Sequence, residues 1–208
     1  GEIGEVGGKN SDVHELHAYM KGFNRKLKER GATLIGLSKI SVQTGTAHGG
    51  FVGPDGKPRM DVKIDLVALE ELSRVARDEY GLSGAVQHGA STLSADAFDA
   101  FPRVGACEIH LATNFQNMVY DHPSFPASLK AEMYAWVREH ALEEKKAGDT
   151  DEQFLYKARK KAIGPFKSKV WNLPADVRAS IGKSLEDQFA FLMGKLKVNG
   201  TAAVVAKY

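Results

Sequence analysis

Three short apolar runs, each ending in polar residues, stand out in the first half of the chain. They cover residues 40–44, 84–87 and 106–113, and they read as buried strands. Residues 12–30 and 65–80 instead repeat apolar positions every three or four residues, which indicates amphipathic helices. Strands that alternate with helices are typical of βα units, so we expect an α/β fold with a parallel sheet.

The pattern changes at about residue 126, after which it becomes helical without further strands. Segments 128–146, 149–161 and 174–196 are charged or amphipathic and predict helices. We therefore expect two parts. Residues 1–125 form the α/β part, and residues 126–208 form a helical extension that packs on the sheet or across a subunit interface.

A segment rich in turn-forming residues interrupts the alternation. Residues 51–63 contain the run Gly-Pro-Asp-Gly-Lys-Pro, which predicts an exposed loop.

The composition argues against several classes of function and favours none. The chain has 208 residues, of which 43% are hydrophobic and 26% charged, and its net charge is +2. This balance gives no electrostatic reason to expect a nucleic-acid or membrane partner, and no apolar run approaches the roughly 20 residues of a membrane span. The single cysteine, Cys107, falls in a predicted core strand and excludes an internal disulfide. We therefore expect a reducing, cytoplasmic environment.

Histidines mark the ends of the predicted strands. His48 and His88 close the first two strand motifs, and glycine follows each directly; His110 lies at the end of the third. Sites in parallel sheets form at the carboxyl ends of the strands. Neutral imidazole is a zinc ligand, and the glycines let the backbone approach a ligand. The pattern favours a metal site, and the alternative is that both histidines are only hydrogen-bonded within loops.

The same edge carries groups suited to an anion. Ser91 adds a hydroxyl three residues after His88, and Thr113 heads a predicted helix whose N-terminus can hold a phosphate.

Other histidines are weaker candidates for metal ligands. His14 and His17 have a spacing that metals use, but on a surface helix we expect them to be solvated.

Four short motifs together resemble the class II, zinc-dependent fructose-bisphosphate and tagatose-bisphosphate aldolases. They are Glu-Ile-Gly…Val-Gly-Gly at 2–8, Gly-Thr-Ala-His-Gly at 45–49, His-Gly-Ala-Ser at 88–91 and Leu-Ala-Thr at 111–113. Their order and spacing also match, and the resemblance extends over residues 1 to about 120, with a fainter likeness in the terminal helices.

The resemblance implies a (β/α)8 TIM barrel, of which this chain would supply strands 6–8 and a C-terminal helical extension. Three strands cannot close a barrel that needs eight. We therefore expect the remainder, with another zinc histidine, an aspartate beside it and the general base, in a segment that precedes this chain.

Site residues follow from the resemblance position by position. It implies that His48 and His88 bind Zn²⁺, that Glu2 can join them, and that a monovalent cation lies near the phosphate site. His110 would be the catalytic residue that contacts the substrate. The positions that would hold the substrate phosphate are Gly49, Gly89, Ser91, Ala112, Thr113 and Lys169.

Two departures from the family pattern bear on the chemistry. His110 stands where the family usually has an asparagine, so the side chain is larger and titratable. Lys9 and Asn10 stand where some members carry two loop glutamates, one of them implicated in proton transfer. The identity of the proton donor is therefore open.

The resemblance implies reversible aldol cleavage of fructose 1,6-bisphosphate to dihydroxyacetone phosphate and glyceraldehyde 3-phosphate, within carbohydrate metabolism. Two other readings stay open: an aldolase for another phosphorylated sugar, such as a tagatose-type substrate, and a non-catalytic phosphosugar-binding homologue. In each case the expected partners are a small phosphorylated sugar and further copies of the chain, as a homodimer or larger homo-oligomer.

Overall fold

The computed structural model describes residues 1–5, 8–31, 33–46, 52–59 and 63–207 of the chain. These residues form an α/β structure that divides into two compact units. The first unit comprises Gly1–Gly50, Met60–Leu111 and Lys195–Tyr208, and the second comprises Phe51–Arg59 and Ala112–Gly194.

The elements alternate in the first unit and are helical in most of the second. The strands are β1 (Ile40–Val42), β2 (Ala85–Gln87) and β3 (Glu108–Ile109), and the helices are α1 (Val13–Arg30), α2 (Leu66–Tyr80), α3 (Ala100–Arg103), α4 (Thr113–Tyr120), α5 (Ala127–His140), α6 (Asp151–Ala158), α7 (Lys167–Trp171), α8 (Ala175–Lys195) and α9 (Ala202–Val205).

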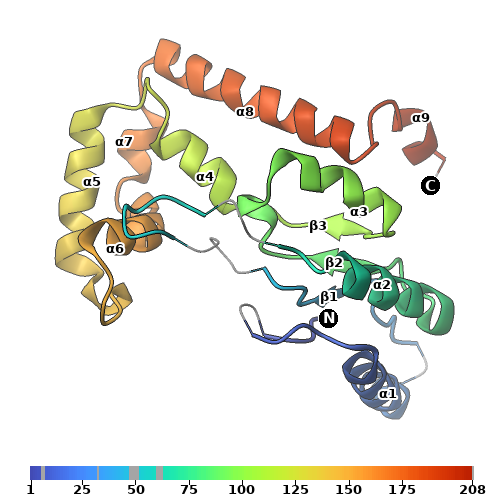
Figure 1. Cartoon of the computed structure of the whole chain (residues 1–208). Coiled ribbons are helices and arrows are strands. Elements are labelled where there is room, and N and C mark those ends of the chain that lie inside the picture. The colour runs from blue at the N-terminus through green and yellow to red at the C-terminus, as the bar shows by residue number, and fades with distance from the viewer. Residues whose placement is uncertain (6–7, 32, 47–51, 60–62, 208) are drawn as a thin grey trace. The chain divides into compact units, whose positions relative to one another are not determined.

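The sheet of the first unit is parallel throughout, in the order β1-β2-β3 (Figure 1). Its register pairs Ser41 with Val86 and Val86 with Glu108. Glu2 extends the sheet on the other side of β1 through a parallel bridge to Ser41. The expected α/β class with a parallel sheet is thus confirmed, and the carboxyl ends of the strands share one edge.

Local capping explains where α1 and α2 begin. The Asp12 side chain accepts from the backbone N–H of Glu15 at 2.9 Å, and Glu15 reaches back to the N–H of Asp12, which completes a capping box. The Asp65 side chain caps α2 by accepting from the backbone N–H of Ala68 at 2.9 Å. Both helices bury one apolar face; Leu16 of α1 and Leu69 of α2 are fully buried.

The amino ends of β2 and β3 are held together by Ser73 and Arg77 of α2. The buried Ser73 hydroxyl donates to the carbonyl of Gly105 at 2.6 Å and accepts from the N–H of Ala85 at 2.9 Å. Arg77 donates to the same Gly105 carbonyl at 2.6 Å. A Cβ on Gly84 would lie 2.7 Å from the Ser73 hydroxyl, so glycine is required at that position. Hydrogen bonds from α2 therefore hold the amino ends of these two strands together.

The second unit has an apolar core of its own, to which α4, α5, α6 and α8 contribute, with Phe154, Met133 and Val137 among its most buried members. The Arg159 side chain is only 3% exposed in this unit. Its guanidinium donates to Asp121 at 2.9 and 3.0 Å and lies over the rings of Tyr120 and Tyr156.

The described part of the predicted loop 51–63 is a tight turn rather than a free loop. Val52 and Pro58 form an antiparallel bridge. Two residues at the start of α6 hold this turn. The N-cap residue Thr150 donates to the carbonyl of Pro54 at 2.8 Å, and Gln153 donates to that of Val52 at 3.0 Å. The segment is nevertheless an exposed loop, as predicted, because Pro54, Asp55 and Lys57 are exposed and none of residues 52–59 is buried.

The third strand is shorter than predicted, and the expectation for Cys107 was wrong. Strand β3 covers Glu108–Ile109 instead of residues 106–113, and Cys107 is exposed rather than in the core. As described, β3 is the edge strand of the sheet, so one of its sides has no neighbouring strand to cover it. Partial desolvation nevertheless raises the pKa of the Cys107 thiol, which donates a hydrogen bond to the carbonyl of Ala85 at 3.4 Å.

Candidate functional site

Three of the predicted site residues come together at the carboxyl edge of the sheet. The carboxylate Oε1 of Glu2 lies 3.9 Å from Nδ1 of His88. The rings of His88 and His110 are stacked, with centroids 4.4 Å apart. The three side chains come from the segment beside β1 and from the ends of β2 and β3. Parallel pairing therefore brings together residues that are far apart in sequence.

The Glu2 and His88 donors suit a metal in kind and in spacing. Zinc binds imidazole nitrogen and carboxylate oxygen at about 2.0–2.2 Å, so two ligands on one tetrahedral ion lie about 3.4 Å apart. The observed 3.9 Å needs only a small adjustment. Within the residues that the structure describes, no group of three or more His, Cys, Asp or Glu side chains is arranged to hold a metal. The remaining predicted ligand, His48, lies outside the described residues.

His110 contacts Glu108 of β3, which is paired in turn with Lys39 just before β1. Nε2 of His110 contacts the Glu108 carboxylate, which also binds the ammonium of Lys39. The hydrogen bond from Lys39, followed by that from His110, lowers the pKa of Glu108, so this carboxylate stays ionised at neutral pH. The His110 side chain is 51% exposed and therefore accessible to a ligand.

The residues proposed for the phosphate are divided between the units. Gly89 has a left-handed backbone (φ +69°) and begins a short 3-10 helix, Ala90–Thr92, that contains Ser91. Gly49 lies outside the described residues. The two other residues of this group on the third strand motif, Ala112 and Thr113, belong to the second unit, where Thr113 is the first residue of α4 as predicted.

Lys169, the last residue of the predicted phosphate group, lies on α7 in the second unit. Its ammonium contacts the carboxylate of Glu132 and lies 5.4 Å from the ring centre of Phe166. Its side chain is therefore engaged within that unit in this structure.

The two histidines on α1 behave differently from each other. His14 is exposed, as expected. His17 is not simply solvated, because its Nδ1 lies 2.6 Å from the hydroxyl of Tyr80. This contact gives His17 a structural partner on α2.

A buried polar network contacts the backbone of His88, and the sequence patterns gave it no role. Gln87, Thr44 and Thr46 are each no more than 1% exposed. The Gln87 side chain accepts a hydrogen bond from Thr44 and donates to Thr46 and to the carbonyl of His88. The available signal was an amide residue closing an otherwise apolar strand, just before a candidate ligand.

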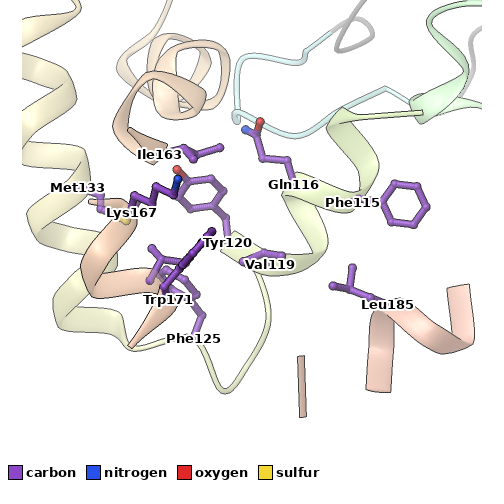
Figure 2. Close-up of a pocket in the computed structure, with 11 residues that line it drawn as sticks. Phe115, Gln116, Val119, Tyr120, Phe125, Met133, Ile163, Lys167, Trp171 and Leu185 are labelled. Atoms are coloured by element: carbon purple, nitrogen blue, oxygen red, sulfur yellow. The ribbon is translucent and has the colours of Figure 1, made fainter. Parts of the chain in front are cut away.

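A second concave feature lies wholly within the second unit. Figure 2 shows Trp171, Lys167 and Ile163 around a hollow of about 320 Å³ whose other walls include Tyr120 and Phe125. The Lys167 ammonium lies 4.5 Å from the Trp171 ring centre. The lining is otherwise almost entirely apolar, and a single ammonium held over an aromatic ring does not suit a ligand with two phosphate groups.

Among the described residues, no helix combines the length and the apolar character needed to cross a bilayer.

The chain is similar to a known protein family. The family described as Fructose-bisphosphate aldolase class-II matches residues 1–171. The matched region ends at the last residue of α7, so it contains all three strands and every predicted site residue.

Proposed function

The chain belongs to the class II fructose-bisphosphate aldolase family, and on this premise we propose that it takes part in zinc-dependent, reversible aldol cleavage of a ketose bisphosphate. The substrate that we propose first is fructose 1,6-bisphosphate, with dihydroxyacetone phosphate and glyceraldehyde 3-phosphate as products. The observation that carries the proposal is the pairing of Glu2 with His88, beside His110, at the carboxyl edge of a parallel sheet.

The same premise extends to the architecture. We propose that β1, β2 and β3 correspond to strands 6, 7 and 8 of a (β/α)8 barrel. Their parallel order and the helices between them support this assignment. We further propose that residues 1–125 form the barrel part and that residues 126–208 form a helical extension.

We propose that His88, Glu2 and His48 hold the metal. Bound zinc supplies a Lewis acid for the ketone oxygen of the substrate. The chain's own part is to present ligands in a fixed arrangement. The Glu2 carboxylate adds negative charge beside the His88 ring, and the parallel bridge to Ser41 holds the backbone of Glu2 against β1.

We propose that the substrate phosphate binds at Gly49, Gly89, Ser91, Ala112 and Thr113, with Lys169 as a further contact and a monovalent cation nearby. The left-handed turn at Gly89 and the Ser91 hydroxyl on the 3-10 helix support this placement, since backbone N–H and hydroxyl donors suit an anion. Fixing the phosphate would orient the bond to be cleaved.

His110 is proposed to contact the reacting part of the substrate. Its ring stacks on His88 and keeps one nitrogen on Glu108, which fixes the ring plane and leaves the other nitrogen for a hydrogen bond to substrate. A fixed ring presents that nitrogen in one direction.

Metal analysis combined with an aldol-cleavage assay of the purified full-length protein tests the proposal. We expect bound zinc and turnover in the wild type, and loss of both in His48→Ala and in His88→Ala. His14→Ala, which changes an exposed histidine on α1, serves as the matched control and should retain both. Zinc and rate retained in either strand-end variant would remove that histidine from the site.

Two alternatives have specific observations behind them. His110 in place of the family asparagine favours a different phosphorylated sugar, and cleavage rates on fructose and tagatose bisphosphates would decide between the substrates.

Lys9 and Asn10 in place of loop glutamates favour a non-catalytic phosphosugar-binding homologue. Asn10 donates to Asp65 at 2.9 Å, so it has a structural role here. Sugar-phosphate binding without turnover in a zinc-loaded protein would select this second alternative.

A further inference from the structure

The strongest unexplained feature of the first unit is the side-chain amide of Gln87. This side chain is fully buried at the end of β2. Its Oε1 accepts from the Thr44 hydroxyl at 2.6 Å, and its Nε2 donates to the Thr46 hydroxyl at 2.9 Å and to the carbonyl of His88 at 2.5 Å. Both amide hydrogens and the amide oxygen are therefore used.

A buried amide is a poor choice for stability alone. A well-packed leucine of similar volume would fill the space without removing a polar group from water, and replacing hydrogen-bonded polar groups by apolar ones is often neutral or stabilising. A fully satisfied polar network does something that a leucine does not, because it fixes one orientation of the groups that it joins.

The group fixed here is the backbone of His88. Its carbonyl accepts from two donors, Nε2 of Gln87 and the Thr46 hydroxyl, the latter at 2.7 Å. The next residue, Gly89, turns the chain through a left-handed conformation. The two hydrogen bonds and the turn at Gly89 therefore fix the backbone of His88, and with it the direction in which the ring leaves the strand.

The network also joins His88 to the strand beside Glu2. Gln43, itself buried, donates to the carbonyl of Thr46 at 2.9 Å, and its backbone exchanges hydrogen bonds with Ser11. Ser11 in turn donates to the carbonyl of Ile3 at 3.2 Å. A continuous set of hydrogen bonds thus runs from the residue after Glu2 to the backbone of His88.

We propose that Gln87 is a positioning residue, whose side-chain amide, acting through Thr46, holds His88 at the spacing from Glu2 that metal binding requires. This inference rests on the proposed function, since it assigns the pair to a metal. It adds a residue outside the ligand set.

The test compares zinc affinity and ligand geometry in matched variants. Gln87→Leu should weaken zinc binding by about 10-fold or more, as measured by competition with a chromophoric chelator. The visible spectrum of the cobalt-substituted protein should shift as well, because the ligand field follows the positions of the ligand atoms. Val86→Ala is the control, since Val86 is buried on the same strand but points to its other face. It should lower thermal stability and leave zinc affinity within about twofold.

Thr46 provides a second pair of variants in case Gln87→Leu does not fold. Thr46→Val removes the hydroxyl that donates to the His88 carbonyl and should weaken zinc binding, whereas Thr46→Ser keeps the hydroxyl and should restore it. Wild-type zinc affinity and an unchanged cobalt spectrum in Gln87→Leu or in Thr46→Val would overturn the inference and leave the proposed function standing. A wild-type protein that binds no zinc would instead remove the proposed function, and this inference with it.

Discussion

Arg159 concentrates more interactions than any other single side chain described in the second unit. Its guanidinium is paired with Asp121, donates to the amide oxygen of Asn117, and lies 5.1 and 4.9 Å from the ring centres of Tyr120 and Tyr156. Its Nε is buried without a hydrogen-bond partner among the described residues. The charge is tolerated in the core because Asp121 and the two rings compensate it.

Removal of that compensation should be costly. We predict that Asp121→Ala lowers the free energy of unfolding by about 2–3 kcal/mol, because the Arg159 cation stays buried without its carboxylate. Urea denaturation followed by tryptophan fluorescence measures the change. Glu139→Gln, which alters an exposed carboxylate on α5, is the control and should change the stability by less than about 0.5 kcal/mol. Equal effects of the two substitutions would contradict this account of the cluster.

The same pair predicts a pH dependence. Burial acts to raise the pKa of Asp121, but hydrogen bonds from Arg159 and Lys130 outweigh it, and the net result is a lowered pKa. A carboxyl whose pKa is lower in the folded protein contributes stability above its unfolded pKa of about 3.9, and that contribution is lost as pH falls through the folded value. We predict that stability declines below about pH 4 and that Asp121→Asn flattens this decline. Thermal melts across pH 2–6 would show it, and an unchanged slope in the variant would exclude Asp121 as the cause.

At the scale of elements, the packing of α2 on the sheet should carry much of the stability of the first unit. Leu69 of α2 is fully buried, whereas Val67 of the same helix is 76% exposed. We predict that Leu69→Ala lowers the free energy of unfolding by about 2–5 kcal/mol through lost burial and a cavity. Val67→Ala should change it by less than about 0.5 kcal/mol. Chemical denaturation of both variants checks the difference, and a small effect at Leu69 would mean that this face of α2 is not a core face.

The short segment that carries Glu2 should depend on glycine at position 4. Gly4 has φ +78°, and a Cβ there would overlap the hydroxyl of Ser11. We predict that Gly4→Ala costs about 1–3 kcal/mol of stability and weakens zinc binding, because it displaces the Glu2 segment from β1. Gly22→Ala is the control: Gly22 lies inside α1 with open space around its Cα, so that substitution should be neutral or stabilising. Unchanged zinc affinity in Gly4→Ala would separate Glu2 from the metal.

How far the sequence predicts these elements depends on whether their causes are local. Helices α1 and α2 start where Asp12 and Asp65 predict, because capping and apolar spacing act within a few residues. Strand β3 is two residues long rather than eight, because strand length depends on pairing with distant residues. The Gln87 network was missed for the same reason: its partners lie 41 and 43 residues away, and a lone glutamine carries no periodic signal.

For the whole molecule, we predict a homodimer or larger homo-oligomer. Several large apolar side chains of the second unit are exposed, including Trp171 at 68%, Phe189 at 48% and Met193 at 47%. Such side chains often mark subunit interfaces. Light scattering should give at least twice the chain mass of 22.6 kDa. A concentration-independent mass equal to one chain would contradict the prediction.

The bonding of Ser73 and Arg77 at the amino ends of β2 and β3 has a practical consequence. It lies at the end of the sheet opposite to His88 and His110, so substitutions there should alter the melting temperature without disturbing the proposed metal site. An engineer who wants a more heat-resistant catalyst should therefore search around α2 and Gly105. Randomising residues near His88 and His110 in the same search would mix effects on thermal stability with effects on turnover.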